Sequence, residues 1–331
     1  MLLSPNEPIS PLGIRMCAGL LAPFMSDTGK TEIETVYGVP ANRLYDMSVD
    51  DAWALDDIET AAGALAVFFR NRQVASDVAS TLGSFAQTLP SDVSDAQAQL
   101  DRWTAVNTLG LISTAPVNVN AETEVVAASA VAVDAPWLYR AVRFADSFLL
   151  SVPNGPGYVT ADDRAFLAVG FLKGGLEARF AMSKDGDDAA IAMLSENVDG
   201  LHPADVTSQW VTSETAPADP GNEVPVARLP RFAQTASHNL LDDAERYGLG
   251  SAKSEGVPGL DAVLDQVAQN VMVEITETGV KAAAVTMTSM TRGMTFGTVD
   301  YLSADFTQGR IAYGVYAHGV DTPIVAGIYA P

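Results

Sequence analysis

Residues 273–295 of the chain read VEITETGVKAAAVTMTSMTRGMT, and they determine how we interpret the remaining sequence. Val271, Val273 and Ile275 alternate with polar side chains, which predicts a strand with one buried face. Gly279 follows, where the backbone is free to turn in either direction. The run of small residues after it contains no proline, so it is able to lie as an exposed loop or to pair as a strand. This combination predicts a segment that moves.

A strand formed by this run would have two chemically different faces, because side chains of a strand point alternately to opposite sides. If Ala282 faces the core, Val280 and Ala284 face it too, whereas Lys281 and Ala283 face water. In the opposite register Lys281 would be buried without a partner, at a cost of several kcal/mol. We therefore expect the first register.

The composition of the chain excludes several classes of function. The 331 residues carry 19 Lys and Arg against 41 Asp and Glu, and the formal net charge of −22 opposes binding to nucleic acids and anionic membranes. No apolar run reaches the ~18 residues that a membrane span needs. Cys17 is the single cysteine, so an internal disulfide is excluded, and its apolar neighbours indicate a buried, inert thiol.

Hydrophobic periodicity divides the chain unevenly between helices and strands. Helices are expected mostly in the first third and strands in the last, without a regular alternation of strand and helix, so the fold class is α+β. The expected helices cover residues 14–24, 31–37, 49–62, 74–85, 95–107 and 239–247. The expected strands cover residues 64–69, 124–133, 166–171, 176–182, 226–229, 271–275, 311–316 and 323–329.

The sequence lacks the common residue patterns of catalysis and metal binding. Residues 26–31 read SDTGKT and end like a phosphate-binding loop, but Phe24 occupies a position where that motif requires glycine. The three histidines, His202, His238 and His318, do not have the spacing of metal ligands. No Gly-x-Ser-x-Gly motif is present. We therefore expect no catalytic residues, no metal, no cofactor and no enzymatic activity.

Several segments, taken in their order along the chain, resemble those of the serpin family. They are residues 10–14 (SPLGI), 29–38, 100–112, 125–137, 229–232 (LPRF), 240–249, 274–284 and 322–331. The hinge-like run 274–284 also lies at the distance from the C-terminus that the family shows. Each short match is weak alone, but together they make the chain similar to a serpin over nearly its whole length.

The resemblance implies one serpin domain over residues 1–331, with three β-sheets, about eight helices and an exposed reactive-centre loop at residues 280–298. It implies a monomeric suicide-substrate inhibitor of a serine or cysteine endopeptidase. The target protease cleaves the loop, which inserts into the central sheet before the acyl-enzyme hydrolyses. The alternative is a serpin-fold protein that does not inhibit and instead has a binding or structural role.

The resemblance also implies the positions of the functional residues. Counting from Gly279 puts the cleaved bond at Arg292–Gly293, with Met290 and Met294 as rival positions. Arginine favours a trypsin-like target, whereas methionine favours a chymotrypsin-, elastase- or subtilisin-like one. The hinge comprises Glu277, Gly279, Val280, Ala282, Ala283 and Ala284, and the sheet-opening region comprises Trp137, Ser129 and Gly13.

The sequence departs from the family's pattern at several positions. Only nine residues precede Ser10, so the family's first long helix is expected to be missing, and there is no leader of basic and then apolar residues. Gly13 occupies the place of a buried serine, Ser129 that of an asparagine, and Val280 that of a threonine or serine. The resemblance favours the extracellular space, and the lack of a leader makes the cytoplasm the alternative.

Overall fold

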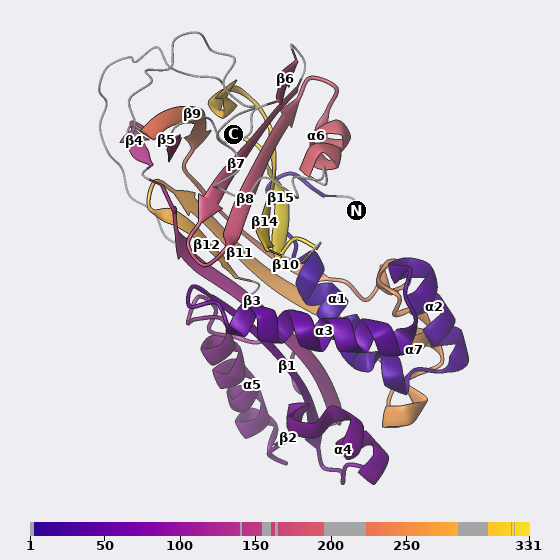
Figure 1. Cartoon of the computed structure of the whole chain (residues 1–331). Helices are drawn as coiled ribbons and strands as arrows, with labels where there is room; N and C mark the ends of the chain where they lie inside the picture. The colour runs from indigo at the N-terminus through magenta and orange to yellow at the C-terminus, as the bar shows by residue number, and fades with distance from the viewer. Residues whose placement is uncertain are drawn as a thin grey trace.

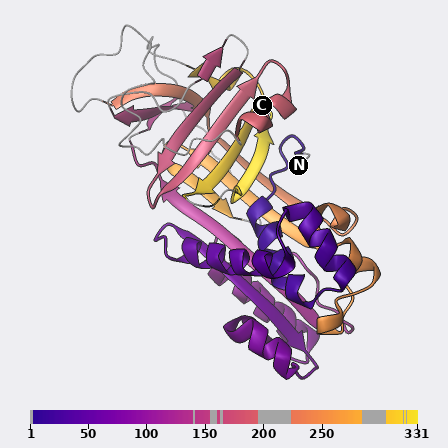
Figure 2. The same ribbon diagram turned by 45° about the vertical axis from the view of Figure 1, so that its right-hand side comes forward.

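A computed structural model of the chain describes residues 3–139, 141–153, 160–162, 165–194, 223–283, 304–318, 320 and 322–331. Within these residues, three β-sheets and seven α-helices confirm the expected α+β class. Two sheets lie together at one end of the molecule, and the largest sheet extends from them between the helices (Figure 1, Figure 2).

The helices are concentrated in the N-terminal part of the chain. The described α-helices are α1 (Pro11–Leu21), α2 (Asp27–Tyr37), α3 (Ala41–Asp56), α4 (Ser76–Leu82), α5 (Val93–Asn107), α6 (Asp187–Leu194) and α7 (Gly250–Ser254). Short 3-10 turns lie at Ala22–Phe24, Gly83–Phe85, Ala244–Tyr247, Pro258–Leu260 and Phe306–Gln308. None of the described helices is long and apolar enough to cross a membrane.

The strands form sheets of six, five and four members. The six-stranded sheet has the order β10 (Phe232–Asn239), β11 (Ala268–Thr276), β12 (Gly279–Ala283), β3 (Val125–Pro136), β1 (Ala61–Arg70) and β2 (Ala86–Leu89). The five-stranded sheet contains β15 (Val325–Tyr329), β14 (Ile311–Ala317), β8 (Leu176–Ser183), β7 (Ala165–Leu172) and β6 (Thr160–Asp162). The four-stranded sheet contains β13 (Ala304–Asp305), β9 (Glu223–Pro230), β5 (Ser147–Pro153) and β4 (Val142–Phe144).

Helix α1 is buried against one face of the six-stranded sheet. Its N-cap Ser10 accepts a hydrogen bond from the Gly13 N–H at 3.0 Å, and Pro11 stands in the first turn, where its missing N–H is tolerated. A helix whose apolar residues cover all its sides is buried. The buried apolar residues of α1 include Leu12, Ile14, Met16, Leu20 and Leu21.

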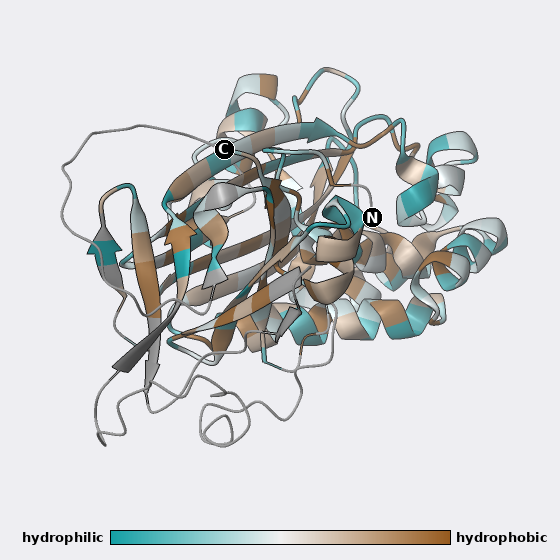
Figure 3. Ribbon diagram, turned by 90° about the horizontal axis from the view of Figure 1, so that it is seen from above, coloured by the Kyte–Doolittle hydropathy of each residue, from teal (hydrophilic) through white to brown (hydrophobic). Residues whose placement is uncertain are grey.

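The side chains of β1 point alternately to the two faces of the six-stranded sheet, and apolar side chains pack on each face. Phe69 joins the main core with Met16 of α1, whereas Phe68 packs with Leu100 of α5 on the other face. The ring of Trp103 in α5 meets Phe68 edge-on, with 5.7 Å between the ring centroids. In Figure 3 much of the ribbon of the central strands is coloured hydrophobic, whereas the outer helices carry mixed colours.

Two of the expected helices differ from the structure. The segment expected as a helix over residues 239–247 begins at the last residue of β10, Asn239, and contains only the 3-10 turn Ala244–Tyr247. The helix expected over residues 49–62 ends at Asp56, and the alanine-rich segment that begins at Ala61 forms β1, where Ala61 pairs with Val133 of β3. Alanine favours helices in isolation, but pairing and burial in a sheet override that preference.

The residues before α1 form an extended segment rather than a helix. The Asn6 N–H donates to the carbonyl oxygen of Ile328 at 2.7 Å, and the Ile9 N–H donates to that of Ala326 at 2.9 Å. This segment therefore lies against β15. In the described part of the chain no helix precedes α1.

Candidate functional site

The segment that follows Gly279 is a strand in the middle of the six-stranded sheet. β12 lies between β11 and β3 and runs antiparallel to both, with Val280 opposite Ile275 on one side and Ala135 on the other. The start of the expected exposed loop is thereby corrected, because residues 280–283 pair within the sheet.

The side chains of β12 alternate between two faces. Val280 and Ala282 have no exposed surface and belong to the main core. Lys281 points to the opposite face, where its Nζ donates to Oδ2 of Asp134 at 3.2 Å and the side chain stays 44% exposed. The register predicted from the sequence is confirmed at these three residues of β12.

The surroundings of Ala283 correct one detail of the expected register. Ala283 shares its face with Lys281, yet it has no exposed surface, because Ile112 packs on it together with Ala62 and Ala132. Ile112 belongs to the connection between α5 and β3. The end of β12 is therefore covered from the side that was expected to face water.

A tight hairpin joins β11 to β12. Thr276 pairs with Gly279, so the loop consists of Glu277 and Thr278 alone. Gly279 has a φ angle of 151°, and a Cβ atom at this position would lie 2.2 Å from the carbonyl oxygen of Ala135. A larger residue would push β12 away from β3, so the hairpin requires glycine here.

Two arginines hold Glu277 at the tip of the hairpin. Its Oε2 lies 2.7 Å from Nε of Arg231, between β9 and β10, and its Oε1 lies 3.9 Å from Nη1 of Arg143 on β4. The shorter contact is an ion pair whose angles are too bent for a hydrogen bond. Because the side chain of Glu277 is only 18% exposed, solvent weakens the attraction less than it would at the surface.

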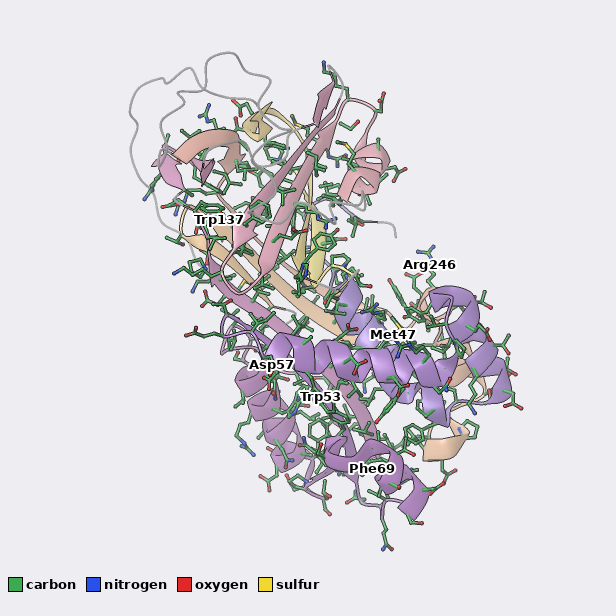
Figure 4. The ribbon with its side chains drawn as sticks, viewed as in Figure 1. Met47, Trp53, Asp57, Phe69, Trp137 and Arg246 are labelled. Carbon is green, nitrogen blue, oxygen red and sulfur yellow. The ribbon has the colours of Figure 1, made fainter. Side chains whose placement is uncertain are left out.

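Trp137 stands next to the point where β12 enters the sheet (Figure 4). Its indole Nε1 donates to the carbonyl oxygen of Thr276 at 2.8 Å, which ties the end of β3 to the end of β11. The ring is buried and packs near Phe148 and Phe180. Gly170 leaves room for it, since a Cβ there would lie 2.5 Å from the ring.

A hydrogen bond joins Gly13 and Ser129, the other two residues of the predicted sheet-opening region. Oγ of Ser129 donates to the carbonyl oxygen of Gly13 at 2.7 Å, which fastens the middle of β3 to the first turn of α1. A Cβ on Gly13 would lie 2.9 Å from Oγ of Ser10, so the turn has no room for a larger residue. The structure brings Gly13 and Ser129 together and places Trp137 apart from them, at the end of β3.

Gln269 of β11 completes this group, and the sequence interpretation missed it. Its Oε1 accepts from the Ser10 N–H at 2.8 Å, and its Nε2 donates to the Ser10 carbonyl oxygen at 3.1 Å. The signal was present in the strand pattern. Gln269 lies on the same face as Val271 and Val273, and a buried polar side chain among apolar ones indicates a specific partner.

β12 lies between β3 and β11 only as far as Ala283. Beyond that residue a gap separates the two strands, and we call this gap the seam. In the described chain β12 ends at Ala283, so residues 125–131 of β3 and 268–271 of β11 border the seam. Two cavities of ≈ 100 Å³ and ≈ 110 Å³ lie along it. Ser129 and Gln269 line the first cavity from opposite sides of the seam.

Cys17 of α1 lines both cavities of the seam. Its Sγ lies 3.9 Å from the carbonyl oxygen of Ala127 on β3. Burial raises the pKa of the Cys17 thiol to about 11, because the thiolate would lose its hydration. Near neutral pH the thiol is therefore protonated and reacts slowly with alkylating reagents.

The residues predicted for the cleaved bond, Arg292 and Gly293 with the rivals Met290 and Met294, lie outside the described residues. The same holds for Ala284 of the hinge. Among the residues that the structure describes, no three or more His, Cys, Asp or Glu side chains are grouped so that they could hold a metal ion.

No protein-family model and no curated protein matches the sequence. Solved structures do match the fold. A cleaved Serpin 42Da is 16% identical with a TM-score of 0.71, and the match covers 98% of this chain and 92% of that one. The thermophilic serpin tengpin in its native state is 14% identical with a TM-score of 0.70, over 100% and 90% of the two chains. Thyroxine-binding globulin in complex with thyroxine is 12% identical with a TM-score of 0.69, over 98% and 93%.

These likenesses cover nearly the whole length of the chains compared. Together with the three sheets and the strand order, they show that the chain has the serpin fold. The expected fold is thus confirmed.

Proposed function

We propose that the protein is a suicide-substrate inhibitor of a serine or cysteine endopeptidase. The observation that carries the proposal is the position of β12, which ends at Ala283, where the seam begins. The first residues after the hinge already form a central strand, and beyond Ala283 no strand of the described residues lies between β3 and β11. A strand that continued the direction of β12 beyond Ala283 would enter that gap.

Continuing the register of β12 indicates where the following residues would pair. Ala283 lies opposite Ala132 and Met272, so three residues further on Thr286 would come between Ser129 and Gln269. These two are the polar residues that line the first cavity from the two strands, together with Asn270. About ten new ladder hydrogen bonds at ~1 kcal/mol each would give a driving force on the order of 10 kcal/mol.

Inhibition would follow from the timing of this insertion. The protease nucleophile attacks the carbonyl carbon of the cleaved bond, the new amino terminus leaves, and an ester or thioester remains. Insertion of about ten residues at ~3.3 Å each would carry the attached protease about 33 Å along the sheet before water attacks the ester. Cleavage at Arg292–Gly293 would suit a trypsin-like protease, whereas Met290 or Met294 would suit an elastase- or subtilisin-like one.

One observation favours the alternative, a serpin-fold protein without inhibitory activity. Residues 280–283 are inserted in the intact chain, so part of the insertion energy is released before any protease arrives. In that case the protein would act by binding, in the extracellular space or in the cytoplasm. For the inhibitory function we propose a monomer that works in the extracellular space.

The proposed function is tested by incubating the protein with trypsin, chymotrypsin, elastase and subtilisin. We expect a band near the summed mass of the two proteins on a denaturing gel with at least one protease. Edman sequencing of the released C-terminal peptide then identifies the cleaved bond. Cleavage by every protease without such a band would leave the binding alternative.

A further inference from the structure

The connection between α5 and β3 crosses the outer face of the seam. Its central part, residues 113–120, is called here the bridging segment. Ala115 and Val117 line the first cavity, and Val117 and Val119 line the second. The bridging segment therefore covers the part of the seam that lies below Ala283.

On the side of β3, the bridging segment is fastened to α5. The Ala115 N–H donates to Oδ1 of Asp101 at 2.9 Å, and the Val119 N–H donates to Oε1 of Gln97 at 2.8 Å. Nε2 of Gln97 donates to the carbonyl oxygen of Val117 at 3.3 Å. Three hydrogen bonds thus make the bridging segment and α5 one unit.

On the side of β11, a single side chain holds the bridging segment. Oε1 of Gln266 accepts from the Asn118 N–H at 3.1 Å, and Nε2 of Gln266 donates to the Asn118 carbonyl oxygen at 3.1 Å. Gln266 is itself fixed to the body of the protein, because the Leu240 N–H donates to the carbonyl oxygen of the adjacent Val267 at 2.7 Å.

We propose that Gln266 is a latch. By keeping the bridging segment closed over the seam, it raises the activation barrier to insertion of the chain beyond Ala283. The inference rests on the insertion described above as the proposed function. It assigns to the half-buried carboxamide of Gln266 a role in the rate of that insertion.

The alternation of side chains explains why the latch has to open. An inserted strand would place residues 285 and 287 on the same face as Ala283, which is the face that the connection covers. Alanine fits beneath Ile112, but Met287 is much larger and would enter the space beneath the bridging segment. Because α5 holds the segment through three hydrogen bonds and Gln266 through two, the Gln266 side is the weaker attachment.

Cys17 provides a readout of the latch that needs no protease. It lines both cavities and is the only cysteine, so every label incorporated by iodoacetamide reports access to the seam. We expect Gln266→Ala to raise the labelling rate of the intact protein about tenfold, because two hydrogen bonds are lost. Asn118→Ala should leave the rate within about twofold of the parent, since both bonds use the main chain of Asn118.

Gln99→Ala is the matched control, because Gln99 lies on α5 and donates its one carboxamide hydrogen bond to the Thr88 carbonyl oxygen, away from the seam. Equal labelling rates in Gln266→Ala and Gln99→Ala would overturn the proposal. Circular dichroism of both variants confirms that they fold. If either variant is unfolded, Gln266→Glu replaces Gln266→Ala, and it should label faster than the parent because it cannot donate to Asn118.

A second measurement separates the latch from the proposed function. After cleavage of the loop, the heat resistance of Gln266→Ala should develop faster than that of the parent, and an unchanged rate would overturn the latch. If no protease forms a stable complex while Cys17 labelling still depends on Gln266, the inhibitory function fails and the latch stands. If complexes form and neither rate depends on Gln266, the latch fails and the function stands.

Discussion

The carboxamide of Gln269 holds the main chain of Ser10 from both sides, accepting from its N–H at 2.8 Å and donating to its carbonyl oxygen at 3.1 Å. Across the seam, Ser129 donates to the carbonyl oxygen of Gly13 at 2.7 Å. Both strands that border the seam are therefore fastened to the N-terminus of the same helix. Moving β3 further away from β11 requires one of these attachments to break.

Gln269→Leu should destabilise the protein by about 2–3 kcal/mol, because the Ser10 N–H and carbonyl would be left buried with fewer partners. Urea unfolding followed by circular dichroism measures the change. Gln99→Leu is the control and should lose less than about 1 kcal/mol, since its single hydrogen bond lies at the surface. A loss for Gln269→Leu no larger than that of the control would show that the attachment to Ser10 contributes nothing.

Trp137→Phe should lower the free energy of unfolding by about 1–2 kcal/mol. The smaller ring removes the hydrogen bond to the Thr276 carbonyl oxygen and leaves space beside Phe148. Trp53 on α3, labelled with Trp137 in Figure 4, is 60% exposed, so Trp53→Phe should change the stability by less than about 0.5 kcal/mol. Similar losses of stability in the two variants would contradict the role of Trp137 in holding the end of β3 to the end of β11.

Titration of Cys17 should make the protein less stable at high pH. Its pKa in the folded protein is raised to about 11 from the ordinary value of 9.0, so the unfolded chain loses this proton first. The contribution of Cys17 is complete below pH 9 and is lost as the pH rises towards 11, by an amount on the order of 2 kcal/mol. Subtracting the stability profile of Cys17→Ala isolates this effect from the tyrosines. Parallel profiles would mean that the thiol is not buried.

Ala282→Arg should abolish the proposed inhibition and leave a protein that proteases only cleave. Ala282 has no exposed surface, and an unpaired guanidinium there would keep β12 out of the sheet. Lys281→Arg is the matched control, because position 281 faces outward and keeps Asp134 as a partner. On denaturing gels, we expect the stable band with trypsin to persist in Lys281→Arg and to disappear in Ala282→Arg. A stable band in both would contradict the insertion of β12.

Features that depend on the local alternation of apolar and polar residues could be predicted from the sequence. The apolar pattern before Gly279 predicted β11, and the charge of Lys281 predicted which face of β12 points outward. The burial of Ala283 could not be predicted from the sequence, because the residue that covers it, Ile112, lies more than 150 residues earlier in the chain. Gln269 could have been found as the one polar residue in an apolar register, but its partner Ser10 lies 259 residues away.

The pairing of Gln266 with Asn118 could not be predicted from any pattern. Both residues are polar and lie in irregular segments, where polar side chains are ordinary and carry no periodic signal. Only the course of the α5–β3 connection across the sheet brings the main chain of Asn118 within 3.1 Å of the Gln266 carboxamide.

The central claim is that the chain beyond Ala283 enters the seam as a strand after the loop is cleaved. Thermal unfolding of the protein before and after limited proteolysis within residues 284–298 tests it most directly. Filling the seam would add about ten ladder hydrogen bonds, so we predict that the cleaved protein unfolds at a midpoint about 15 °C higher. An unchanged or lower midpoint after complete cleavage, with both fragments still associated, would contradict the account.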